Sequence, residues 1–113
     1  MRLVNQTKNT LLAEGVSLAN TPFKRLKGLL GRKDFPAGQA LIIQPCNSIH
    51  TFFMRFPIDV LFVDKDNRVI QTISSLKPFR LTPIYFHARL VIEFSPRTIK
   101  DSLIEIGDRL TLE

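Results

Sequence analysis

Short apolar segments separated by turn residues run along most of the chain. Such segments, four to eight residues long and bounded by turn chemistry, are typical of strands. The predicted strands cover residues 2–5, 11–18, 40–43, 49–54, 58–64, 68–75, 90–94 and 109–113. Lys65-Asp66-Asn67 predicts a hairpin between the fifth and sixth of them. Many short strands separated by turns favour a small antiparallel barrel or sandwich.

Two short helices are predicted where a hydroxyl residue precedes a proline. Thr21 can cap free backbone N–H groups and Pro22 suits the first helical position, so the first helix begins there. Ser95-Pro96 repeats the pattern and predicts a second helix over residues 96–103. The expected fold is mainly β (α+β): a small antiparallel β-barrel-like domain with two short helices.

Composition sets the broad class of the protein. With 113 residues and 44% hydrophobic content, the sequence predicts one globular domain over residues 1–113. No apolar run approaches the roughly 18 residues that a membrane span needs, and no secretory signal is visible. The single cysteine cannot form an internal disulfide and fits a reducing compartment. A cytoplasmic location is therefore expected.

The net charge of +6 raises the question of an anionic partner. The densest basic cluster lies on and just after the first predicted helix, at Lys24, Arg25, Lys27, Arg32 and Lys33. No zinc-knuckle spacing, aromatic RNP-like pattern or helix-turn-helix accompanies it. A solvated helix face is the favoured interpretation. A nucleic-acid-associated regulator that uses this helix is the alternative.

The segment from Cys46 to Asp59 combines a thiol, an imidazole, a guanidinium and a carboxylate within an apolar stretch. Polar groups are costly to bury unless they are paired. In a regular strand over residues 49–56, His50 would share its face with Phe52 and Met54. Both faces are largely apolar, so we expect a strand covered on both sides and His50 in an apolar neighbourhood.

Two carboxylates with apolar neighbours need partners. Asp59 alternates with apolar residues, and Glu93 lies between Ile92 and Phe94. The favoured hypothesis is an ion pair between Arg55 and Asp59, with Glu93 paired to Arg25 or Arg55. Alternatively Arg55, His50 and Arg25 line a pocket that accepts an anion, since the guanidinium fork suits carboxylate or phosphate.

Cys46 and His50 are a candidate catalytic or metal-binding pair. As a catalytic dyad they lack a third orienting group. As metal ligands they are too few unless Asp59 or Glu93 joins them. The favoured interpretation is a buried thiol and a hydrogen-bonded core histidine. No catalytic residue is assigned, and no metal or cofactor is predicted.

The central segment resembles the signature of the DUF192 family, also called UPF0127. The matching residues are Cys46, His50, Thr51, Met54, Arg55, Pro57, Ile58, Asp59 and Phe62. Further matches are Arg25, Gly28, Leu29 and Gly31 upstream, and Val91-Ile92-Glu93 and Gly107-Asp108 downstream. Ser95-Pro96-Arg97 stands where the family often has a glycine. The resemblance implies a compact, β-rich, barrel-like domain with short helices, and it implies no particular reaction, cofactor or partner.

The leading functional hypothesis is a non-enzymatic binding or accessory domain with a polar pocket around the Cys46 to Asp59 segment. Its partner would be a small ligand or another protein. The candidate ligand-binding residues are His50, Arg55, Asp59, Glu93, Cys46 and Arg25. We expect a concave opening beside His50, with at least one of Arg55, Asp59 and Glu93 at its wall. The alternative is a hydrolase-type enzyme that uses His50 with Cys46 or Asp59.

Overall fold

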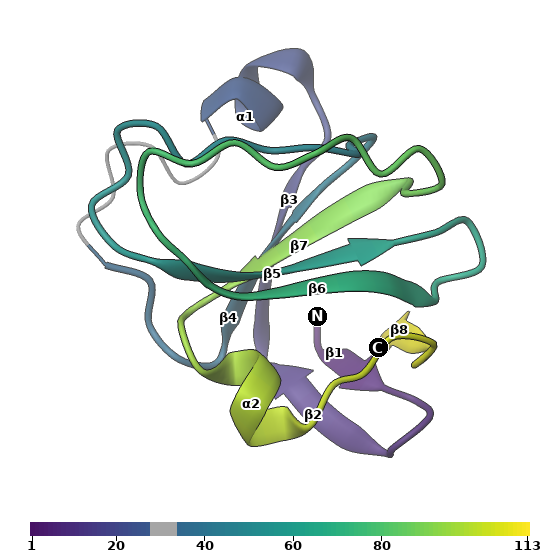
Figure 1. Ribbon diagram of the computed structural model, residues 1–113. Helices are drawn as coiled ribbons and strands as arrows, with labels where there is room; N and C mark the ends of the chain where they lie inside the picture. The colour runs from purple at the N-terminus through teal and green to yellow at the C-terminus, as the bar shows by residue number, and fades with distance from the viewer. Residues whose placement is uncertain (28–33) are drawn as a thin grey trace.

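The computed structural model describes residues 1–27 and 34–113 and contains two β-sheets (Figure 1). The five-stranded sheet has the order β3 (Gly15–Ala19), β4 (Gln39–Ile43), β7 (Leu90–Phe94), β5 (Ile58–Val63), β6 (Val69–Leu76). The three-stranded sheet has the order β2 (Thr10–Ala13), β1 (Leu3–Asn5), β8 (Leu110–Leu112). The helices are α1 (Pro22–Lys27) and α2 (Thr98–Ser102).

The mainly β architecture with short helices is confirmed, and the strands form two sheets rather than a closed barrel. Neighbouring strands are antiparallel, apart from the parallel pair β3 and β4. The single strand predicted over residues 11–18 is wrong, because the chain turns at Glu14. The backbone N–H groups of Glu14 and Gly15 both donate to the Gly38 carbonyl, at 2.9 and 3.1 Å. This corner sends β2 into the smaller sheet and β3 into the larger one.

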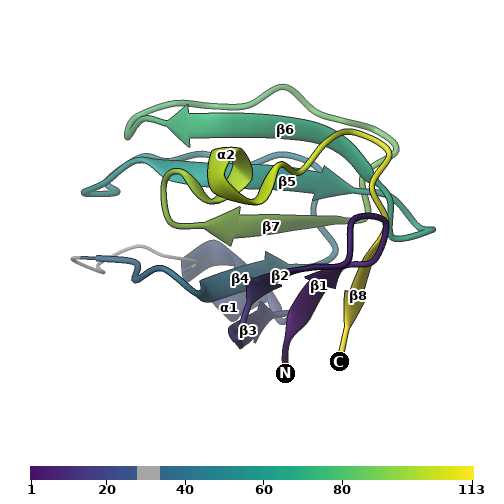
Figure 2. The ribbon, with the colours of Figure 1, turned by 90° about the horizontal axis from the view of Figure 1, so that it is seen from below.

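Two hydrophobic cores lie on opposite faces of the five-stranded sheet. The first lies between the two sheets, where Leu3 and Leu12 pack with Ile42 and Leu61, and α2 adds Ile99. Figure 2 shows the strands of the larger sheet stacked in order, with α2 against them. Because β5 is covered on both faces, all six of its residues are buried. This double cover explains its continuous apolar sequence.

The second core is covered by two long segments, residues 44–57 and 77–89. From the sheet it receives Leu41, Val60 and Val91, and from the covering segments Ile49 and Met54. In Figure 1 these segments pass above the larger sheet, on the side away from α2 and the smaller sheet. Of the candidate functional residues, Cys46, His50 and Arg55 lie on these segments, and Glu93 on β7 faces the core beneath them.

The strand predicted over residues 49–54 is wrong: this stretch is a loop with one isolated bridge, between His50 and Leu81. Phe53 has a φ of 66°, in the left-handed region that a regular strand does not use. The second helix is also shorter than the predicted 96–103. Arg97 has a φ of 76°, so helical geometry begins only at Thr98.

Part of the predicted first helix and of the basic cluster lies outside the described residues. This concerns Gly28, Leu29, Leu30, Gly31, Arg32 and Lys33. Within residues 1–27 and 34–113, no helix is long and apolar enough to cross a membrane.

Candidate functional site

Asp59 lies on β5 and is 0% exposed. Its Oδ1 accepts a hydrogen bond from the Ser75 backbone N–H at 2.9 Å, and its Oδ2 accepts one from Ile99 N–H at 2.8 Å. The carboxylate therefore joins β5 to the end of β6 and to the start of α2. The register between β5 and β6 shifts at this point, between Ile58 and Val60. The shift accompanies the turn that presents Ser75 to Asp59, where Ser75 has a φ of 52°.

The predicted ion pair between Arg55 and Asp59 is wrong. The ion pairs found among the described residues involve other groups, and the Arg55 side chain is exposed. Two backbone donors already satisfy the Asp59 carboxylate, so it needs no cation. These two hydrogen bonds hold β5, β6 and α2 together at Asp59.

Glu93 lies on the central strand β7 and faces the second core. Its neighbours across the sheet are Leu41 on β4 and Val60 on β5. The residue is 4% exposed, and Oε2 has no hydrogen-bond partner among the described residues. Burial raises the pKa of the Glu93 carboxyl to about 7. The predicted ion pair between Glu93 and Arg25 or Arg55 is not found among the residues that the structure describes.

Cys46 is the link between Glu93 and Arg25, because the charges of both residues act on its thiol. The pKa of the Cys46 thiol is raised, mainly by burial and also by the Glu93 charge. The hydrogen bond to the Ser48 carbonyl and the Arg25 charge lower this pKa and oppose the rise. The thiol donates to that carbonyl at 3.1 Å. Arg25 Nη1 donates to the Pro45 carbonyl at 3.1 Å, while Arg25 Nε is buried without a described partner. We call Glu93, Cys46 and Arg25 the Glu93 cluster.

His50 and Arg55 do not join the Glu93 cluster. Both are exposed on the segment 44–57, so the expectation of His50 buried in a covered strand is wrong. The His50 ring stacks on Phe52 with 5.2 Å between centroids, and its Nδ1 accepts from Phe52 N–H at 3.3 Å. Because the segment is a loop rather than a strand covered on both sides, the His50 side chain is exposed instead of buried.

Cys46 and His50 form no hydrogen bond with each other in the described structure. The Cys46 thiol donates to the Ser48 carbonyl, and His50 Nδ1 accepts from Phe52 N–H. Residues 1–27 and 34–113 contain no group of three or more His, Cys, Asp or Glu side chains that could hold a metal ion. The geometry thus offers a partly buried polar cluster rather than a dyad or a set of metal ligands.

Thr51 has a role that the sequence analysis did not assign. Its hydroxyl donates to the Lys77 carbonyl at 2.6 Å and accepts from Arg80 N–H at 2.9 Å. Its backbone N–H and C=O bond to Arg80 and Phe79, at 2.8 and 2.9 Å. Thr51 therefore fastens the segment 44–57 to the segment 77–89. Because Thr51 is fully buried in an irregular and largely apolar segment, its hydroxyl needs hydrogen-bond partners, and the backbone of the other segment supplies them.

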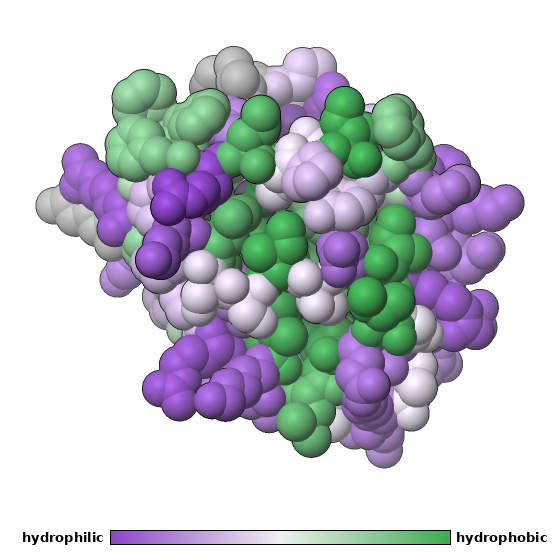
Figure 3. Space-filling view, in the orientation of Figure 1, coloured by the Kyte–Doolittle hydropathy of each residue, from purple (hydrophilic) through white to green (hydrophobic). Residues whose placement is uncertain are grey.

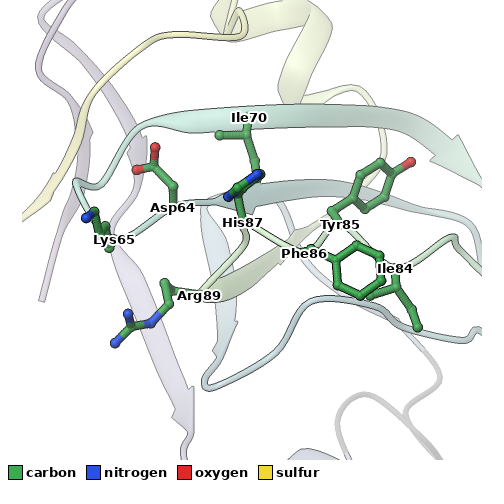
Figure 4. Close-up of a pocket in the computed structure, with 8 residues that line it drawn as sticks. All are labelled: Asp64, Lys65, Ile70, Ile84, Tyr85, Phe86, His87 and Arg89. Carbon is green, nitrogen blue, oxygen red and sulfur yellow. The ribbon is translucent and has the colours of Figure 1, made fainter.

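A broad hollow of about 790 Å³ lies beside the turn between β5 and β6 (Figure 4). Its lining includes Asp64, Ile70, Tyr85, His87 and Arg89. None of the six candidate residues lines it, and the opening expected beside His50 stays a prediction.

Comparisons with known proteins agree along nearly the whole chain. The DUF192 family model, described as an uncharacterized ACR, matches residues 3–112. The chain is 37% identical to the UPF0127 protein PH1112 of Pyrococcus horikoshii over 114 residues, covering 96% of each. It is 33% identical to the UPF0127 protein PF1050 of Pyrococcus furiosus, covering 96% of this chain and 95% of that protein.

A solved structure shows the same fold. The crystal structure of a protein of unknown function from Novosphingobium aromaticivorans superimposes with a TM-score of 0.82 at 19% identity. The match covers 98% of this chain and 82% of that one. The family model and the relatives extend over the same elements that position Glu93, Cys46 and Asp59. The chain therefore belongs to the DUF192 family, also called UPF0127.

Proposed function

We propose that this protein is a non-enzymatic binding domain that holds a small polar ligand at the Glu93 cluster. The observation that supports the proposal is a pair of buried polar atoms without described partners, Glu93 Oε2 and Arg25 Nε. An unsatisfied buried polar group costs about 1–3 kcal/mol. A ligand that supplies both partners removes this cost and gains affinity from its removal.

The chemistry of the two atoms defines the ligand. Arg25 Nε–H is a donor and needs an acceptor. Since burial raises the pKa of Glu93 to about 7, its carboxyl accepts or donates a hydrogen bond near neutral pH. The proposed ligand is a small molecule that presents an acceptor and a donor on the same group, as a primary amide, a urea or an amino acid does.

The contacts of the other candidates favour binding over hydrolysis. A thiol is nucleophilic as its thiolate, and burial raises the pKa of Cys46. His50 is exposed, with Nδ1 engaged by Phe52 N–H, and Asp59 is fully used by two backbone donors. A nucleic-acid role for the basic helix receives little support, because Arg25 is directed to the Pro45 carbonyl.

The proposal is tested by a fragment screen in which acetamide, urea, glycinamide and free amino acids are probed by ligand-observed NMR and thermal shift. Glu93→Leu keeps an approximately similar size and removes both the hydrogen-bond acceptor and the donor. Glu14→Leu, at an exposed corner residue, is the matched control. We expect probes that bind the wild type and the control, with at least about tenfold weaker binding to Glu93→Leu. Equal affinity of every bound probe for all three proteins contradicts the proposal.

A further inference from the structure

The segments 44–57 and 77–89 form one continuous surface, because backbone hydrogen bonds join them along their length. Thr82 N–H donates to the Ile49 carbonyl at 3.0 Å, Tyr85 N–H to the Asn47 carbonyl at 2.9 Å, and Cys46 N–H to the Arg89 carbonyl at 3.1 Å. We call the exposed surface of these segments the two-loop face. Since its backbone is already held in place, it can bind a partner with little loss of conformational entropy.

Large apolar side chains protrude from the two-loop face. They are Phe52 (39% exposed), Phe53 (75%), Phe79 (57%), Leu81 (68%), Ile84 (53%) and Phe86 (82%). The rings of Phe53 and Phe79 meet edge to face with 5.8 Å between centroids. Figure 3 shows hydrophobic residues along the upper rim, where the two segments run in Figure 1, and further ones across the middle of this face. A gathering of exposed apolar groups marks an interaction site.

The charged groups of this face are all basic. Arg55, Lys77, Arg80 and Arg89 are exposed, and neither segment contains an aspartate or a glutamate. The nearest acidic group along the hollow of Figure 4 is Asp64, beyond the face. Its Oδ1 accepts from the backbone N–H groups of Asp66 and Arg68. The face therefore combines protruding apolar side chains with uncompensated positive charge.

The combination of protruding apolar side chains and positive charge favours one class of binding partner over the others. A second copy docked by the same face would bring like charges together, which is unfavourable. A nucleic acid would satisfy the charges and could stack bases on the phenylalanine rings, but it would offer no apolar environment to the aliphatic Leu81 and Ile84. A bilayer with anionic lipids satisfies both features, since headgroups attract Lys and Arg while the acyl boundary takes up apolar side chains. We propose that the two-loop face docks this protein on an anionic lipid surface, independently of ligand binding at the Glu93 cluster.

The test is flotation of the full chain with vesicles of phosphatidylcholine containing about 30% phosphatidylglycerol, against phosphatidylcholine alone. One variant removes apolar groups with Phe53→Asn and Phe86→Ser. Asparagine is chosen because it tolerates the left-handed backbone of Phe53. A second variant removes charge with Arg55→Gln and Arg80→Gln. The control combines Ile106→Ser and Lys100→Gln, which are exposed elsewhere on the molecule.

We expect the wild type and the control to float with anionic vesicles, and each double variant to bind at least about tenfold more weakly. Binding should fall as salt is raised, because exposed charges are screened. Circular dichroism checks that all four proteins are folded. Absence of flotation with anionic vesicles, or equal binding to phosphatidylcholine alone, overturns the proposal. Retention on a polyglutamate matrix without vesicle binding also overturns it and assigns the face to an acidic protein.

Discussion

Asp59 and Glu93 lie on adjacent strands and are almost completely removed from solvent, yet they face opposite cores. Asp59 accepts two hydrogen bonds from the backbone, whereas Glu93 Oε2 has no described partner. Their apolar flanks correctly predicted burial. The type of partner could not be predicted, because the donors to Asp59 are backbone N–H groups 16 and 40 positions away in the sequence.

At the residue scale, Asp59→Ala should lower the free energy of unfolding by about 3 kcal/mol, because two hydrogen bonds to a carboxylate are lost and the buried Ile99 N–H is left without its acceptor. Urea denaturation measures the change. Asp66→Ala, at an exposed turn residue, is the control and should change stability by less than about 0.5 kcal/mol. Similar midpoints for the two variants would refute the architectural role of Asp59.

At the scale of elements, the hydrophobic pattern correctly predicted the strands that consist of one continuous apolar run. The strands predicted at 58–64 and 90–94 match β5 and β7 within one residue. The same pattern wrongly predicted a strand over residues 49–54, which are also largely apolar but form a loop. There the Thr51 hydroxyl bonds to the backbone of the segment 77–89 and Phe53 adopts a positive φ. Such tertiary contacts override local preference and leave no periodic signal.

The joining of the two segments can be tested at Thr51. Thr51→Val keeps the shape but removes the hydroxyl that binds Lys77 and Arg80, so we expect a loss of about 1–2 kcal/mol in the free energy of unfolding. Thr10→Val is the matched control, because Thr10 Oγ1 is buried without a described partner and its removal should be neutral or stabilising. Equal losses from both substitutions, measured by urea denaturation, would show that Thr51 does not specifically fasten the segments.

At the scale of the whole molecule, the sequence indicated the β-rich class and the family. It did not indicate how the strands divide between sheets. That division depends on the corner at Glu14 and on the parallel pairing of β3 with β4, which brings together residues about 24 positions apart. The Glu93 cluster likewise combines α1, the segment after β4 and β7. Arg25, Cys46 and Glu93 are all among the residues that resemble the family signature, but only the fold brings them together.

The burial of Glu93 affects the stability of the whole molecule. A carboxyl whose pKa rises from 4.5 to about 7 on folding holds its proton more tightly in the folded state. Its contribution to stability is therefore fully present below pH 4.5 and is lost as pH rises to about 7. The expected loss is about 3 kcal/mol across this window.

The most direct test is the free energy of unfolding of the wild type and Glu93→Gln, measured by urea denaturation from pH 5 to pH 8 without ligand. Glutamine does not titrate, so the difference between the two profiles isolates Glu93. We expect the wild type to lose about 3 kcal/mol relative to Glu93→Gln as pH rises, and to be the less stable protein at pH 8. Parallel profiles, or a wild type that gains relative stability with pH, would mean that Glu93 is already paired with a cation in the folded protein and is not free to bind a ligand.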